Sequence, residues 1–134
     1  MFSHLNFLAI AVATVVYFII GALWFSVLFG KPWIKLTGIT MSDEDKKGVP
    51  KVFAVTFVIN FIICMATAIV IYLVNPADAI SAATVGMILG IGFMAAPAAM
   101  NYMYARRPFQ LTMIDAGYHV VAITVVSMIL GVWR

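Results

Sequence analysis

Four stretches of the sequence lack lysine and arginine for about 23 to 25 residues each, and this feature restricts the fold more than any other. About 20 apolar residues let a helix cross a bilayer. The strands of a membrane barrel would need a period-two alternation of apolar and polar residues, which these stretches lack. We therefore predict an all-α membrane protein, a four-helix transmembrane bundle forming a single domain over residues 1–134, with spans at about 6–29, 52–74, 80–104 and 111–133.

The composition excludes the main alternatives. Hydrophobic residues make up 65% of the chain and charged residues only 10%, and the mean hydropathy is +1.11. A soluble domain carries about 45–50% apolar and about 25% charged residues, and a short soluble chain keeps much of its surface in water. This chain is therefore neither an ordinary soluble domain nor a disordered one, and its single cysteine excludes a disulfide scaffold.

The basic residues predict the orientation. Five lysines, the first of them Lys31, lie in the loop 30–51, and Arg106 and Arg107 lie between the third and fourth spans. Only Arg134 lies on the other side. The positive-inside rule places both basic loops in the cytoplasm and both termini outside, as in a multi-pass protein of a bacterial inner membrane. The net charge of +3 then suits anionic membrane lipids, and no soluble basic module exists to bind nucleic acid.

Aromatic residues near the span ends predict an interfacial belt. Trp24 and Trp33 lie at the inner end of the first span, with Lys31 between them in sequence. Tyr102 lies at the inner end of the third span, and Trp133 marks the outer end of the fourth. We expect Trp24, Trp33 and the basic residues to contact the headgroup region.

The loop 30–51 contains a predicted short helix. Ser42 can cap it, acidic residues open the segment 43–47 and lysines close it, an order that complements the helix dipole. Gly48 and Pro50 are expected to stop it. At the opposite side of the membrane, Asp78 is expected to cap the third span. The loop helix is either a solvated connector or a docking segment, and the sequence leaves both open.

Polar and small residues inside the spans fall on stripes at helical spacing. We expect these stripes to face a common interior, because polar groups within the membrane need partners. The stripe members are Thr14, Tyr17, Gly21 and Trp24 on the first span, Thr56, Asn60, Cys64 and Thr67 on the second, and Ala82, Gly86, Gly90, Pro97 and Asn101 on the third.

The third span has two further features. Ala82, Gly86 and Gly90 repeat every four residues, which lets another helix approach closely, either within the bundle or across a homodimer interface. Pro97 frees the carbonyl of Phe93 and is expected to kink the helix.

Asp115 is the only charged residue inside any of the four stretches. A central aspartate disfavours membrane insertion by about 2.5–3.5 kcal/mol, so its carboxylate needs a partner. His119 lies four residues on, where the two side chains can meet on one helix face. Two interpretations remain open: a structural clasp, or a pocket that binds a small ligand, a lipid or a proton. The candidate residues are Asp115, Tyr118 and His119, with Arg106, Arg107, Asn60 and Asn101 as further partners.

Two segments resemble the signatures of the domain-of-unknown-function family 1761, a family of small four-span membrane proteins from bacteria and fungi. They are GALWFSVLFGKPWIKLTGIT, and RRPFQLTMIDAGYHVVAITVVSMILGVW with its D-A-G-Y-H pattern and closing Gly-x-Trp. The resemblance implies the four-span architecture, nominates the same Asp115–His119 patch and implies no substrate. The matching positions are Trp24, Phe25, Phe29, Gly30, Lys31, Trp33, Gly38, Asp115, Gly117, Tyr118, His119, Gly131 and Trp133.

These observations predict a small inner-membrane protein of unestablished activity that forms a homodimer and carries a polar intramembrane pocket. The alternative is a structural or partner-binding subunit with neither transport nor catalysis. We expect no enzyme, because Cys64 lies mid-span in apolar surroundings and the sequence has no catalytic motif. We expect no metal and no cofactor, because the two histidines, His4 and His119, lie far apart in sequence.

Overall fold

The computed structural model of the chain describes residues 2–39 and 42–134. Within these residues every regular element is a helix, and four helical segments are long and apolar enough to cross a membrane. The segments are Phe7–Leu28, Val49–Val74, Ala79–Tyr104 and Phe109–Val132. The prediction of an all-α protein with four candidate spans is therefore confirmed, with boundaries within about three residues of those expected.

Two of the four spans contain a π-helical turn, and short helices fill the connections. The first span is α1 (Phe7–Leu23) followed by the π turn η2 (Trp24–Leu28), and the third is α5 (Ala79–Leu89), the π turn η3 (Gly90–Ala95) and α6 (Ala96–Tyr104). The second and fourth spans are α4 (Val49–Val74) and α7 (Phe109–Val132). The short helices are η1 (Phe2–His4), α2 (Gly30–Thr37) and α3 (Asp43–Lys47).

Two predicted helix caps are present. Ser42 Oγ accepts a hydrogen bond from the Asp45 backbone N–H at 3.2 Å, and the Asp45 carboxylate accepts one from the Ser42 N–H at 3.0 Å. These bonds hold the pKa of Asp45 below its ordinary value. Asp78 likewise caps α5 by accepting from the Ser81 N–H at 2.7 Å. Helix α3 ends at Lys47 with Gly48 as its C-cap, as expected, and Pro50 lies in the first turn of α4, where a helix needs no N–H from it.

Helix α2 is the main element that the sequence did not predict. It occupies the first half of the expected loop and contacts α7. Pro32 in its first turn and Gly38 at its end are the local signals for such a helix. Gly38 takes a left-handed conformation (φ 67°), which ends the helix at no steric cost.

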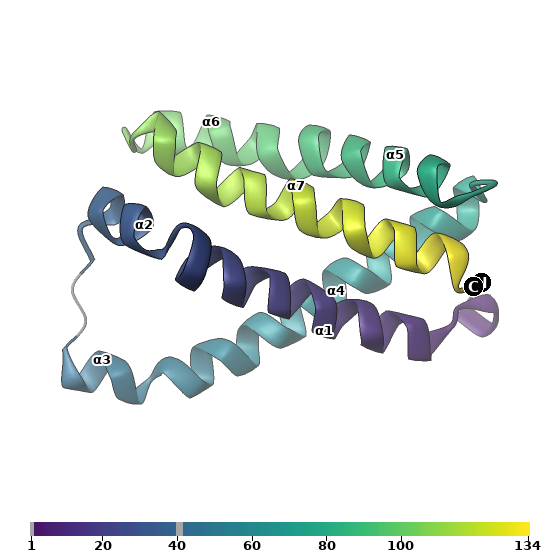
Figure 1. Ribbon diagram of the computed structural model, residues 1–134, viewed down its shortest axis with the longest axis horizontal. Helices are drawn as coiled ribbons and strands as arrows, with labels where there is room; N and C mark the ends of the chain where they lie inside the picture. The colour runs from purple at the N-terminus through teal and green to yellow at the C-terminus, as the bar shows by residue number, and fades with distance from the viewer. Residues whose placement is uncertain (1, 40–41) are drawn as a thin grey trace.

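The spans are arranged around α7 (Figure 1). Helices α1, α4 and α7 contact one another, while α5 and α6 pack along the other side of α7. Figure 1 places the two ends of the chain together at one end of the molecule, which we call the terminal end. Helices α2 and α3 and the turn between α6 and α7 lie at the opposite end, which we call the basic end. The two basic loops therefore share one side, and which side faces the cytoplasm stays a prediction.

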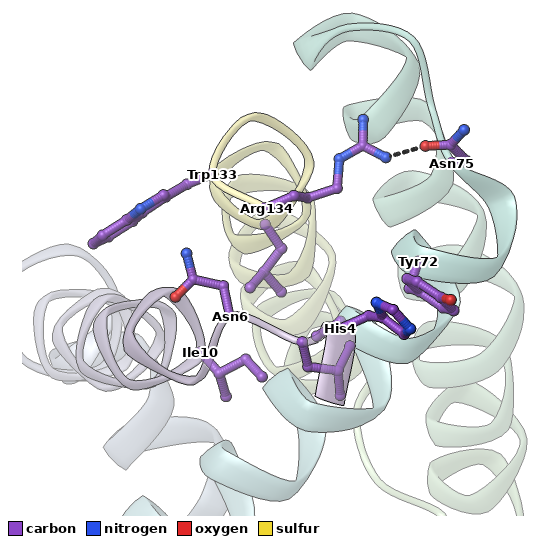
Figure 2. A pocket seen from close by; sticks show the side chains of 10 residues that line it. His4, Asn6, Ile10, Tyr72, Asn75, Trp133 and Arg134 are labelled. Carbon is purple, nitrogen blue, oxygen red and sulfur yellow. Dashed lines mark hydrogen bonds between the residues drawn. The ribbon is translucent and has the colours of Figure 1, made fainter. Parts of the chain in front are cut away.

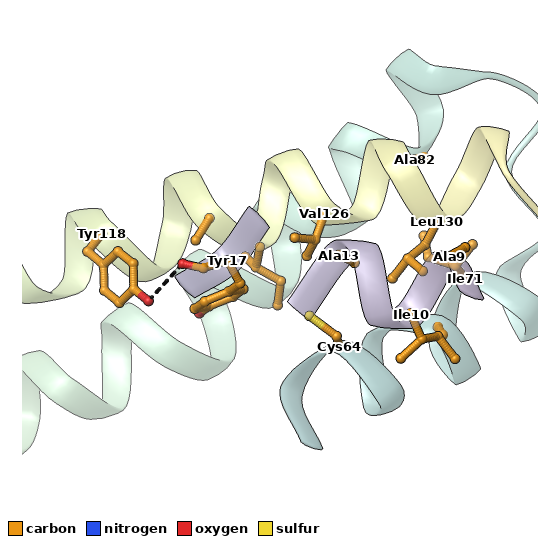
Figure 3. Packing of buried hydrophobic residues seen from close by; sticks show 13 residues of the cluster. Ala9, Ile10, Ala13, Tyr17, Cys64, Ile71, Ala82, Tyr118, Val126 and Leu130 are labelled. Carbon is orange, nitrogen blue, oxygen red and sulfur yellow. Dashed lines mark hydrogen bonds between the residues drawn. The ribbon is translucent and has the colours of Figure 1, made fainter. Parts of the chain in front are cut away.

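The stripes expected on the first two spans face the interior. Tyr17 on α1 and Cys64 on α4 are fully buried, and Asn60 is only 3% exposed. Figure 3 shows Cys64 directed at α1 beside Ala13, with Val126 of α7 close by. Burial of these side chains at the junction of α1, α4 and α7 makes this junction the core of the molecule.

The small-residue repeat of the third span packs against α7 within the same chain. A Cβ added at Gly86 would lie 2.8 Å from the backbone oxygen of Ile123, and one added at Gly90 would lie 2.9 Å from Val120 Cα. Ala82 is fully buried. The repeat therefore lets α5 approach the α7 backbone closely, and the homodimer stays a prediction without support from these three residues.

The second half of the third-span stripe does not face the interior. Pro97 and Asn101 are exposed on α6, unlike Gly86 and Gly90. The intervening π turn η3 explains this difference, because it changes the number of residues per turn and so rotates the stripe away from α7. The exposed Phe93 also lies off the interior. The prediction that these positions line the bundle is wrong, and the kink at Pro97 stays a prediction.

Candidate functional site

The Asp115 carboxylate connects three helices. It lies on α7 and is half-buried. Its Oδ1 accepts a hydrogen bond from Trp33 Nε1 on α2 at 3.0 Å, and its Oδ2 accepts one from the Tyr102 hydroxyl on α6 at 2.5 Å. Hydrogen bonds to a charged group contribute about 1.5–3 kcal/mol each. This carboxylate is therefore a main attachment of α2 and α6 to α7.

Both donors to Asp115 are neutral. Arg106 and Arg107 are exposed in the turn between α6 and α7, and within the described residues neither donates a hydrogen bond to Asp115. Arg106 takes a left-handed backbone conformation (φ 56°) in this turn. The arginine partners considered from the sequence are thus not formed, and Trp33 and Tyr102 instead donate one hydrogen bond to each carboxylate oxygen.

His119 has a partner of its own. Its Nδ1 lies 2.7 Å from the Tyr17 hydroxyl on α1. The Tyr118 hydroxyl donates to the backbone oxygen of Tyr17 at 3.3 Å, and the two tyrosine rings meet edge to face with centroids 5.5 Å apart. The predicted direct pair between His119 and Asp115 is therefore replaced by separate bonds to neighbouring helices, although the two side chains stand one helical turn apart on α7.

The two tryptophans near the first span are used inside the molecule. Trp24 Nε1 donates to the Ile114 carbonyl at 2.9 Å, and Trp33 Nε1 donates to Asp115. Both side chains are half-buried. These bonds attach both indoles to α7, because an indole N–H needs an acceptor and α7 provides two. Their expected place at the headgroup interface stays a prediction. Lys31 stays exposed on α2.

The two candidate asparagines have different positions. Asn60 is buried on α4, one turn before Cys64, and within the described residues its Nδ2 has no hydrogen-bond partner. Asn101 is exposed on α6. Neither hydrogen-bonds to Asp115, so the structure does not bring these two residues into the carboxylate site.

Sequence reasoning missed three partners of the site. Trp33 and Tyr102 hold Asp115, and Tyr17 holds His119. The first two were assigned to the interfacial belt, and Tyr17 only to a polar stripe. A span with a single carboxylate implies that hydrogen-bond donors lie at the same depth of the membrane. No spacing rule, however, predicts a contact between residues that are 82 or 102 positions apart in the sequence.

Two hollows are described, and neither lies at Asp115 and His119. One, of about 580 Å³, lies at the terminal end (Figure 2). The other, a groove of about 420 Å³ beside α2, is lined by Lys31, Lys35 and Gln110. Among the described residues no three potential metal-ligating side chains gather.

The fold and this network define a class of protein: a small helical protein with four segments long and apolar enough to span a membrane, and a hydrogen-bonded carboxylate within the fourth. The model of the family described as a protein of unknown function (DUF1761) matches residues 8–131. The chain therefore belongs to this family, as the two signature segments indicated. No curated protein and no solved structure matches the chain.

Proposed function

We propose that this protein responds to protons in the membrane, and that protonation of Asp115 changes the attachment of α2 to the bundle. One observation carries the proposal: the carboxylate is held by two neutral donors from two other helices. Because no ion pair holds the carboxylate, a proton can bind to Asp115 without breaking a contact between opposite charges, although each donated hydrogen bond favours the ionised form.

The two donors respond differently to a proton on Asp115. An indole N–H can only donate, whereas a tyrosine hydroxyl can donate or accept. The Tyr102 hydroxyl can therefore turn and accept from a protonated carboxyl group. Trp33 can only keep donating, now to a neutral oxygen instead of a charged one, and hydrogen bonds to neutral groups are about half as strong. Protonation thus weakens the α2 attachment more than the α6 attachment.

Other titratable groups surround the carboxylate on each neighbouring element. His119 lies one turn further along α7 and is bonded to Tyr17 of α1. We propose that His119 takes part as the second proton-binding group of the network. The charged groups at the same end are Lys31 and Lys35 on α2 and Arg106 and Arg107 in the turn before α7.

Infrared difference spectroscopy of the reconstituted protein tests the proposal. As the pH falls, we expect the C=O stretch of a protonated carboxyl group to appear, together with a change in tryptophan fluorescence as the Trp33 bond weakens. Asp115→Asn should remove one component of this band, while the four other side-chain carboxyl groups of the chain keep theirs, and it should abolish the pH dependence of the fluorescence. Asp45→Asn is the matched control, because Asp45 is exposed on α3 and outside the network.

The proposal is wrong if Asp115→Asn leaves the infrared titration unchanged and only lowers the thermal stability. Asp115 would then be a structural clasp. Trp33→Phe separates the two parts of the mechanism: it should abolish the fluorescence response while the carboxyl band remains. A fluorescence response that persists in Trp33→Phe would contradict the role given to α2.

A second candidate function rests on α3. Its five residues, Asp43–Lys47, are all charged and exposed, and its main contact is with α4. We propose a partner-docking role for this helix as the alternative. Replacing residues 43–47 by a Gly/Ser segment should abolish capture of a partner from membranes while the bundle stays folded. Identical capture by the replaced and the natural chain would eliminate this alternative.

A further inference from the structure

A pocket of about 580 Å³ lies at the terminal end, far along α7 from Asp115. Its size falls within the range of about 300–1,000 Å³ typical of ligand pockets. It forms where the start of α1 meets the ends of α4 and α7. Figure 2 shows Trp133 on the opposite side of the pocket from His4 and Tyr72.

The interior of the pocket is apolar. Ile10 from α1, Ala68 from α4 and Leu130 from α7 line it, and all three are at most 7% exposed. Around them the pocket becomes aromatic. The His4 and Tyr72 rings stack with centroids 5.8 Å apart and an angle of 11° between their planes. A hydrocarbon group would therefore find a matching surface inside this pocket.

The exposed part of the lining includes a cation that three hydrogen bonds hold. Arg134 donates from Nε to the Gly131 carbonyl, from Nη1 to the Asn75 side chain and from Nη2 to the Pro76 carbonyl. A guanidinium has five N–H donors, so two remain, one on each terminal nitrogen. The three existing bonds hold the group in place before any ligand arrives, which reduces the entropy lost on binding.

The charged side chains that line the pocket have one sign. Among the described lining residues Arg134 carries the permanent charge, and no acidic side chain takes part. Asn6 already accepts from the Ala9 N–H through its Oδ1, which leaves its amide N–H₂ as a donor. The polar groups at the pocket are therefore mainly donors, and they suit an anion.

From this arrangement we infer that the pocket binds an anionic phospholipid of the surrounding bilayer. The two free N–H groups of Arg134 take the phosphate, as guanidinium groups commonly do in a bidentate manner. The first part of an acyl chain lies over Ile10, Ala68 and Leu130. The place of the pocket at the end of the spans, beside Trp133, is the depth at which phosphate groups and the upper acyl chains of a bilayer meet.

Trp133 fluorescence tests the inference in bilayers. Vesicles containing phosphatidylglycerol with brominated acyl chains, which quench nearby indoles, are compared with vesicles containing brominated phosphatidylcholine at the same mole fraction. We expect stronger quenching by phosphatidylglycerol, and the excess should disappear in Trp133→Phe, since Trp24 and Trp33 lie at the other end of the molecule.

Arg134→Gln should weaken the phosphatidylglycerol preference by about tenfold or more, the effect of losing hydrogen bonds to a charged group. Arg106→Gln is the matched control, because it removes one positive charge at the basic end and should leave the preference intact. Arg134→Lys keeps the charge without the planar fork and should give an intermediate preference.

Three results would overturn the inference. The first is equal quenching by the two brominated lipids in the natural protein, which needs no variant to fold. The second is an equal loss of preference in Arg106→Gln and Arg134→Gln, which would indicate general surface charge. The third is binding of inorganic phosphate that removes the excess quenching, which would assign the pocket to free phosphate.

Discussion

Replacing Gly86 by alanine is expected to destabilise the packing of α5 on α7. The added Cβ would lie 2.7 Å from Ser127 Oγ, 2.8 Å from Ser127 Cβ and 2.8 Å from the Ile123 backbone oxygen. The backbone oxygen cannot move aside without moving α7 itself. Gly92, six residues on in the π turn η3, provides the matched control, because nothing lies within 4 Å of a Cβ added there.

The two substitutions together isolate the steric effect. Alanine is favoured over glycine in a helix by about 0.5–1 kcal/mol, and this gain applies at both positions. Overpacking a tight contact costs about 1–3 kcal/mol. We therefore expect Gly92→Ala to stabilise the protein slightly, and the unfolding free energy of Gly86→Ala to lie about 1–3 kcal/mol below that of Gly92→Ala. This gap is about 5- to 150-fold in the unfolding equilibrium constant.

Equilibrium unfolding in mixed micelles, followed by circular dichroism and tryptophan fluorescence, measures this gap. The reasoning is refuted if Gly86→Ala is as stable as Gly92→Ala. Adding Ser127→Ala to Gly86→Ala provides a second check. It should not restore stability, because Ser127 Cβ and the Ile123 oxygen both remain in the way. Full restoration would mean that the hydroxyl alone makes the contact.

Two further predictions follow from the terminal end and from α5–α6. The hydrogen bonds from Ser81 lower the pKa of Asp78 below its ordinary value. Because the folded pKa is lower than the ordinary one, the cap stabilises the protein fully above the ordinary pKa, and this stabilisation is lost as the pH falls through the folded pKa. The NMR signal of the Ser81 amide should follow this loss. In Asp78→Asn the pH dependence of that signal should disappear. If a homodimer uses the outward face of α5–α6, the variant Gly92→Cys in a Cys64→Ala background should form a disulfide between two chains. Val55→Cys on α4 serves as the control. Cross-linking in the control alone would contradict a dimer through this face.

The sequence predicted the spans and most interior positions because membrane burial follows simple local rules. Uncharged stretches of sufficient length become helices, and Tyr17, Asn60 and Cys64 face the interior as their helical spacing indicated. The caps at Ser42 and Asp78 were equally local, since each depends on residues within one turn. These parts of the fold need no knowledge of distant contacts.

The prediction failed where helix phase or distant pairing decided the outcome. A regular period of 3.6 residues places Asn101 with Gly86, but the π turn η3 between them breaks that period. The partners of Asp115 come from α2 and α6, and nothing in the local sequence distinguishes Trp33 or Tyr102 from an ordinary interfacial aromatic. The candidate residue was therefore predictable, whereas the hydrogen-bonding network around it was not.

The central place of α7 explains why the polar residues are distributed as they are. An ionisable side chain within a membrane needs partners on neighbouring helices. Helix α7 contacts α1, α2, α4, α5 and α6, and none of these five helices contacts as many α-helices as α7 does. It can therefore hold both Asp115 and His119, while the polar stripes of α1 and α4 turn toward it. The same helix reaches the terminal pocket through Leu130. The two proposed sites thus share helix α7 but no side chain. We therefore expect Asp115→Asn to leave the phosphatidylglycerol preference unchanged, and Arg134→Gln to leave the infrared titration unchanged.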